Sequence, residues 1–181
     1  MTDNLDLGRP TSGDVIDLIL DDHRLFEALL RDLRDKRSDR DAVRRAFSAL
    51  HVAHAEAEEA EVYPTLRKKD AISDHEAEHG EEEHAEGHEA LLKVLEAEDL
   101  EGEEFDDLVE ELATAVNHHL TEEELTILNP AREEVDPGVR ERLGAAFATA
   151  RNEQLDSDCG RVENVREIVK RAEREGLLDD D

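Results

Sequence analysis

Three pairs of potential metal ligands occur at a spacing of four residues in this sequence. In chain order they are His54 and Glu58, His84 and His88, and His119 and Glu123. Residues four apart lie on the same face of an α-helix, so each pair can direct two side chains at one small region. A further imidazole upstream, that of His23, brings the set to seven candidate ligands.

Five imidazoles and two carboxylates suit a centre of two metal ions. A single zinc ion takes only four ligands, whereas two ions bridged by the two carboxylates use all seven and keep one position open. Nitrogen and oxygen ligands without a thiolate favour iron or manganese. The set therefore predicts a pair of iron or manganese ions, and an Fe(II) pair with an open position could bind dioxygen, peroxide or nitric oxide.

Apolar stripes with gaps of three and four residues mark the helices that must hold these ligands. The first is expected to start near Asp14, with Ser12 or Asp14 as its cap, and the second near Asp39. A third opens at Ser73 with a capping box, because a glutamate follows three residues later. The fourth begins after Gly102.

Prolines indicate where two of these helices stop or bend. The second helix is expected to end near Tyr63-Pro64 or one turn later, and Pro130 is expected to end or kink the fourth, because proline removes a backbone donor. Two further helices are predicted at about 138–154 and 161–175. No strand-like alternation of any length occurs, so the predicted fold class is all-α.

In each of the first four helices, His or Glu takes a position that the stripe reserves for apolar residues. An unpaired carboxylate in such a buried position costs several kcal/mol. A metal ion shared by all four helices would offset that cost, since neutral imidazoles and carboxylates are its natural ligands. The helix pattern and the ligand spacing therefore support the same two-metal centre.

The four ligand segments resemble the motifs of bacterial or archaeal hemerythrin-like HHE cation-binding proteins. The resemblance rests on the segments from Asp14 to His23, His54 to Pro64, His84 to His88, and His118 to Glu123. It covers roughly residues 14–132 and implies an up-down-up-down four-helix bundle. It further implies two non-haem irons, Fe2+ or Fe3+, joined by two carboxylates and an oxo or hydroxo bridge. The ligands that it implies are His23, His54, Glu58, His84, His88, His119 and Glu123.

Several positions leave alternatives open. His84 and His88 compete, because many HHE domains have a single histidine on this helix, and Glu122 competes with Glu123. The remaining candidates are Glu61 as a replacement bridge, His51 as a support for a ligand, an exposed His118, a solvated or weakly metal-binding pair of His75 and His79, Tyr63 as a packing residue, and Cys159 without a role.

The composition excludes several classes of partner. The 181 residues carry a net charge of −29, which repels nucleic-acid phosphates and anionic membranes. No apolar run is long enough to span a membrane, and the first residues do not form a secretory signal. The single cysteine suits a reducing compartment, so we expect a cytoplasmic protein. We also expect a monomer or a weak homo-oligomer.

The sequence predicts three parts: a loose segment 1–13, a hemerythrin-like bundle 14–135 and a helical extension 136–181. The expected function is to bind dioxygen, or to react with peroxide or nitric oxide, at a carboxylate-bridged iron pair. Catalase-like turnover is compatible with this site, but a binding protein is the preferred interpretation. The alternative is a non-catalytic module that binds iron or senses iron or stress.

Overall fold

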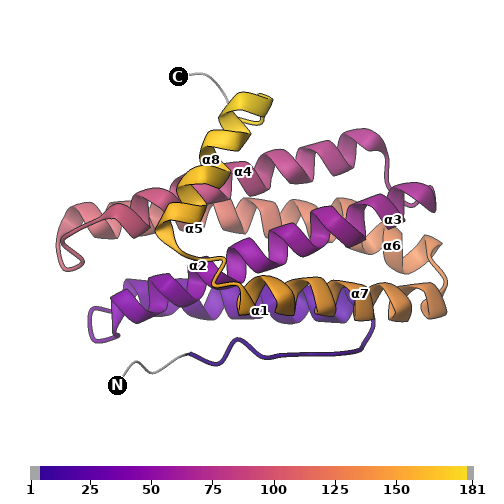
Figure 1. The fold of residues 1–181 in the computed structure, drawn as a ribbon, viewed down its shortest axis with the longest axis horizontal. Coiled ribbons are helices and arrows are strands. Elements are labelled where there is room, and N and C mark those ends of the chain that lie inside the picture. Colours follow the sequence, from indigo (N-terminus) through magenta and orange to yellow (C-terminus); the bar gives the residue numbers. More distant parts are fainter. Residues whose placement is uncertain (1–4, 179–181) are drawn as a thin grey trace.

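Four long helices form the body of the molecule in the computed structural model, which describes residues 5–178. They run side by side in alternating directions (Figure 1), and they are α1 (Val15–Arg34), α2 (Arg40–Ala57), α4 (Asp74–Glu96) and α5 (Glu103–Glu123). No β-strand occurs within the described residues. The prediction of an all-α, up-down-up-down bundle with additional C-terminal helices is confirmed.

Three of the four long helices begin at caps that the sequence predicts. Asp14 accepts a hydrogen bond from the Ile16 backbone N–H at 2.9 Å, and the first turn of α1 follows it. Asp39 caps α2 in the same way. At the start of α4 the Ser73 hydroxyl and the Glu76 carboxylate each accept the other residue's backbone N–H, which completes the capping box.

α2 and α5 each continue through a π-helical segment into a short α-helix. Segment η1 (Glu58–Val62) leads to α3 (Tyr63–Lys68), and η2 (Glu124–Leu128) leads to α6 (Asn129–Glu134). Pro64 and Pro130 lie in the first turns of α3 and α6 and end neither helix. Wide π turns are frequent at functional sites, and here each begins at or directly after a candidate ligand carboxylate.

Two apolar clusters fill the bundle on either side of the candidate ligands. One cluster contains Phe26, Phe47 and Phe105, and the other contains Ile19, Tyr63 and Phe147. Along α1 the buried order is Ile19, His23, Phe26, so the imidazole lies where one cluster gives way to the other. The polar ligands therefore occupy a buried layer between two hydrophobic halves of the core.

The C-terminal helices pack against the bundle. α7 (Pro137–Asp156) starts at an Asp136 cap and lies against α1 and α2, and α8 (Val162–Glu175) crosses α4 (Figure 1). Their connection approaches α2 closely, because a Cβ added at Gly160 would lie 2.4 Å from the backbone nitrogen of Ala49. Cys159 is buried beside this contact.

Residues 5–13 form neither helix nor strand and run along α7. The Asn152 side chain donates to the carbonyl of Pro10 at 2.8 Å, and Arg9 pairs with Asp156 at 2.6 Å. Residues 1–4 of the expected N-terminal segment and residues 179–181 of the expected extension lie outside the described residues. Among the residues described, no helix has the length and apolar content needed to cross a bilayer.

Candidate metal centre

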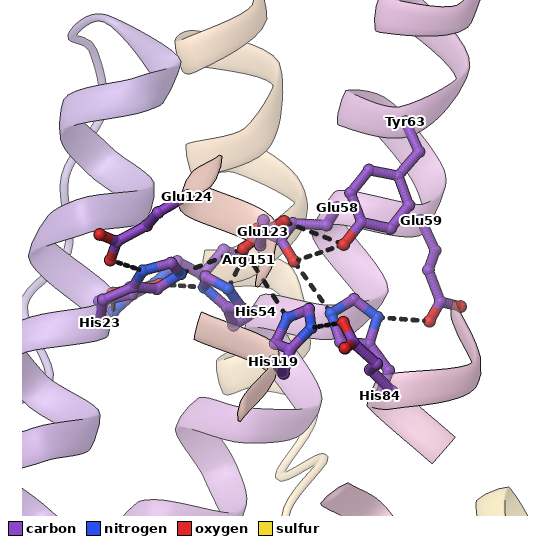
Figure 2. Close-up of polar contacts among 12 residues, drawn as sticks. His23, His54, Glu58, Glu59, Tyr63, His84, His119, Glu123, Glu124 and Arg151 are labelled. Carbon is purple, nitrogen blue, oxygen red and sulfur yellow. Dashed lines mark hydrogen bonds and ion pairs between the residues drawn. The ribbon is translucent and has the colours of Figure 1, made fainter. Parts of the chain in front are cut away.

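Two buried glutamates lie at the middle of the polar layer, each between two imidazoles (Figure 2). Glu58 Oε1 is 3.1 Å from His54 Nε2, and Glu58 Oε2 is 3.0 Å from His84 Nε2. Glu123 Oε2 is 3.1 Å from His23 Nε2 and 3.7 Å from His119 Nε2. The side chains of all these residues are at most 5% exposed.

These side chains form two groups in which every ligand atom lies within 4.8 Å of the others. One group is His23, His54, Glu58 and Glu123, and the other is Glu58, His84 and His119. Glu58 belongs to both groups, which is the position required of a bridging carboxylate. The structure thus brings together six of the seven predicted ligands, from α1, α2, η1, α4 and α5.

Three inward-facing atoms of this layer are buried without a hydrogen-bond partner among the described residues. They are His54 Nε2, Glu58 Oε1 and His119 Nε2. Buried polar atoms are nearly always satisfied, since an unpartnered one costs about 1–3 kcal/mol. Nitrogen and oxygen lone pairs that face one small space are the donors that a metal cation requires, so the residues present fit a metal centre.

Each of the four imidazoles makes a second contact, through Nδ1, with another carboxylate. The pairs are His23 with Glu124 at 2.8 Å, His54 with Asp22 at 3.0 Å, His84 with Glu59 at 2.8 Å, and His119 with Glu83 at 2.9 Å. A carboxylate at Nδ1 fixes the ring orientation and favours the tautomer whose Nε2 lone pair is free for a metal. All four rings are therefore oriented toward the two glutamates.

The carboxylates at Nδ1 connect neighbouring helices in a closed sequence. Asp22 of α1 holds the ring from α2, and Glu59 of η1 holds the ring from α4. Glu83 of α4 holds the ring from α5, and Glu124 of η2 holds the ring from α1. We call this set of four contacts the carboxylate ring.

The carboxylate ring was missed by the sequence analysis, although a signal for it exists. Each of its members directly adjoins a candidate ligand in the chain: Asp22 and His23, Glu58 and Glu59, Glu83 and His84, Glu123 and Glu124. In a chain with 51 acidic residues such neighbours are common. The adjacency gains meaning only when the helices are packed, because each acid supports a histidine on a different helix.

A buried arginine outside the bundle helices supports one member of the ring. Arg151 of α7 is 1% exposed and donates to both oxygens of Asp22, each at 2.8 Å. It also donates to the carbonyl of Leu7 at 2.7 Å. No motif in the sequence singles out Arg151, because the adjacency of α7 and α1 emerges only in the folded chain.

The charges of the buried layer shift the pKa values of its members. Burial acts to lower the pKa of His54, but the charge of Glu58 and the hydrogen bond to Asp22 outweigh it and raise that pKa to about 10. Burial also acts to lower the pKa of His84, but hydrogen bonds and charges of Glu58 and Glu59 outweigh it and hold that pKa well above its ordinary value. Burial would raise the pKa of Glu58, yet His54 and His84 hold it well below the usual range.

His88, the seventh predicted ligand, lies outside both groups of ligand atoms. Its ring is 4.6 Å from that of His51, and its Nε2 is buried without a hydrogen-bond partner among the described residues. Burial and the charges of His84 and Arg171 lower the pKa of His88 to about 3, so the ring is neutral. The sequence-based prediction that His88 ligates a metal is not tested by these distances, and the six ligands that lie together are sufficient for the two ions without it.

The alternatives left open by the sequence differ in burial. Glu123 is 1% exposed and belongs to a ligand group, whereas Glu122 and Glu61 are only partly buried and belong to none. Tyr63, expected to be a packing residue, is buried and also donates its hydroxyl to Glu123 Oε1 at 2.9 Å. Burial and the charges of Glu123 and Glu58 raise the pKa of Tyr63 well above its ordinary value, so the hydroxyl keeps its proton.

A comparison with protein families gives one match for this arrangement. The model described as the hemerythrin HHE cation binding domain matches residues 14–130, which include all seven predicted ligands. Searches of the curated proteins and of the solved structures gave no match. The matched segment ends before α7, so Arg151 lies outside it.

Proposed function

Because the chain belongs to the hemerythrin HHE cation-binding family, we propose that it is a non-haem di-iron protein. Its function is to bind dioxygen, or to react with peroxide or nitric oxide, at the buried pair of ions. The observation that carries this proposal is the position of Glu58, which lies between His54 and His84 and belongs to both groups of ligand atoms. A mononuclear metal site would not need a carboxylate that has a group of ligand atoms on each side.

The proposed ligands divide evenly between the two ions. His23 and His54 would hold one iron, His84 and His119 would hold the other, and Glu58 and Glu123 would offer carboxylate oxygens to both. The donors are four imidazole nitrogens and carboxylate oxygens with no thiolate, a set that favours iron over softer metals. Two imidazoles and two carboxylate oxygens per ion leave room for a small exogenous ligand.

The protein around the ions orients the imidazole ligands and provides one hydroxyl proton at a fixed position. The carboxylate ring holds each imidazole by Nδ1, and Tyr63 keeps its proton and donates it to Glu123 in a hydrogen bond. The apolar clusters above and below the layer limit the access of water. When bound, a ferrous pair supplies electrons for the binding or reduction of a small oxygen or nitrogen species.

Iron content tests the di-iron proposal. After anaerobic reconstitution with Fe(II) and removal of loose metal, the full chain is expected to hold two irons per chain. His119→Ala should hold fewer, whereas the matched surface variant His75→Ala should equal the unaltered chain, because His75 belongs to no ligand group. Fewer than two irons in the unaltered chain would contradict the proposal.

The reactivity of the iron-loaded protein separates binding from turnover. Charge-transfer absorption that appears on oxidation and changes with azide is expected of an oxo-bridged or hydroxo-bridged ferric pair. Hydrogen peroxide decay faster than with the same amount of free iron would establish catalase-like activity. Decay no faster than with free iron would favour the non-catalytic iron-binding or sensing alternative.

A further inference from the structure

A third group of ligand atoms lies outside the proposed iron centre, toward the surface between α4 and α5. It consists of His79, Glu83 and His118. His79 Nε2 is 3.4 Å and His118 Nε2 is 3.3 Å from the same oxygen, Glu83 Oε1. The two histidine side chains are about half exposed, at 47% and 58%, so solvent reaches the group.

Glu83 gives this group a buried anionic atom without a hydrogen-bond partner. The residue is 4% exposed, and its Oε2 accepts the hydrogen bond from His119 Nδ1. Its Oε1 is buried, faces His79 and His118, and makes no hydrogen bond within the described part of the chain. A carboxylate oxygen that leaves water in this way needs a hydrogen-bond donor or a cation to compensate for the lost hydration.

The orientation of His79 repeats the arrangement of the buried imidazoles. Its Nε2 faces the shared carboxylate oxygen, and its Nδ1 lies 3.5 Å from Glu82 Oε2. A carboxylate near Nδ1 favours the tautomer that leaves the Nε2 lone pair free for a metal. The sequence analysis paired His79 with His75, and the folded chain also brings His79 to His118, which is the histidine that shares its ligand group.

We propose that His79 Nε2, His118 Nε2 and Glu83 Oε1 form a second metal site, which binds one divalent transition-metal ion. Two imidazoles and one carboxylate favour Zn2+, Co2+, Ni2+ or Fe2+ over Mg2+ and Ca2+, which prefer oxygen ligands. Three protein ligands with solvent access leave a fourth position for water, as in open zinc sites. The ion is therefore exchangeable, unlike ions held in the buried layer.

Glu83 connects the surface ion with the proposed iron centre. One of its oxygens ligates the surface ion, and the other holds His119, a proposed iron ligand. A cation on Oε1 withdraws charge from the carboxylate and weakens its attraction for the Nδ1–H of His119. Occupancy of the surface site thus alters the donor strength of His119.

Zinc binding to the full, iron-loaded chain tests this site. Competition between the protein and a chromophoric chelator should show one more bound Zn2+ in the unaltered chain than in His79→Ala or His118→Ala. Loss of one ligand should weaken the affinity for this zinc ion by more than about 100-fold. Loss of a residue that only supports a ligand costs less than that. The matched control is His75→Ala, whose ring stacks on that of His79 at 6.2 Å but joins no ligand group.

The differences between variants decide the result whatever metal fills the buried layer. A zinc count that falls by one in His79→Ala and His118→Ala, but not in His75→Ala, supports the site. Equal zinc counts in the unaltered chain and all three variants would overturn it. Iron content measured on the same samples tests the di-iron proposal separately, because neither His79 nor His118 belongs to the buried groups.

Discussion

His54 illustrates how single residues of the buried layer respond to a cation. Its pKa of about 10 means that the imidazole holds a proton at neutral pH when no metal is bound. This proton stabilises the metal-free fold fully below the unfolded pKa near 6.5, and the contribution is lost as the pH rises through about 10. A metal ion needs the neutral ring, so it must displace the proton.

Metal binding is therefore expected to release protons. Addition of Fe(II) to the metal-free chain at pH 7 under anaerobic conditions should acidify a weakly buffered solution, as followed with an indicator dye. Release should shrink as the pH rises toward 10, where His54 loses its proton without metal. His54→Gln should release fewer protons and His75→Ala the same number as the unaltered chain; a pH-independent signal would contradict this account.

The two histidines of α4 are expected to differ when each is replaced. His84 Nε2 lies 3.0 Å from Glu58, whereas His88 lies against His51. His84→Gln should lower the iron content to about one per chain, and His88→Gln should leave it at two, as measured by metal analysis after identical reconstitution. An iron content below two in His88→Gln would instead make His88 a ligand.

At the level of the helices, the π segments explain what the sequence did not predict. Caps and apolar periodicity located the long helices within a few residues, because those signals are local. Pro64 predicted an end for the second helix near Tyr63-Pro64 or one turn later, and the later alternative agrees with Lys68, where the helical chain ends after the wide η1 turn. Neither π segment has a local sequence signature, and each contains a carboxylate that contacts an imidazole on another helix.

The same reasoning applies to the candidate site. His23, His54, Glu58, His119 and Glu123 were predictable because polar ligand types interrupt apolar stripes at regular spacing. The pairings of Glu59 with His84 and of Glu83 with His119 were not, because they join residues on different helices. Those contacts depend on how each helix is rotated about its own axis. The apolar periodicity of the sequence defines that rotation only to about one residue position.

The close approach of the α7–α8 connection to α2 gives a stability prediction. A Cβ at Gly160 would lie 2.4 Å from the Ala49 nitrogen and 2.6 Å from its Cα, and backbone atoms cannot move aside cheaply. Gly160→Ala should therefore lower the free energy of unfolding by about 2 kcal/mol or more in urea denaturation. Gly102→Ala is the control, because its Cβ would meet only the flexible Asp99 side chain.

At the scale of the whole molecule, α7 links the C-terminal part of the chain to the buried layer. Arg151 neutralises Asp22, and Asp22 orients His54. The arginine also reaches the backbone of residues 7 and 8. The N-terminal segment, α7 and the proposed metal centre therefore share one set of buried hydrogen bonds. A change in α7 should alter the orientation of the ligands at the centre.

Replacement of Arg151 should impair both stability and iron binding. Arg151→Met keeps much of the volume but removes one of the two cationic groups that contact buried Asp22, the other being His54. Breaking a buried ion pair costs up to about 3–5 kcal/mol, and His54 should offset part of that cost. Urea denaturation of the metal-free chain and chelator competition for iron measure the two effects. Arg166→Met is the control, because its pair with Glu96 is exposed and worth about 0–1 kcal/mol. Equal losses of unfolding free energy and of iron affinity in Arg151→Met and Arg166→Met would contradict the role of Arg151.

The carboxylate ring has a consequence for the order in which the protein assembles. Its contacts run from α1 to α2, to α4, to α5 and back to α1, so no three helices complete it. We expect high-affinity metal capture to be a late event, after all four helices have docked. Once metal is held, transient opening of any one helix breaks two contacts of the ring, so backbone amide exchange should slow together in all four.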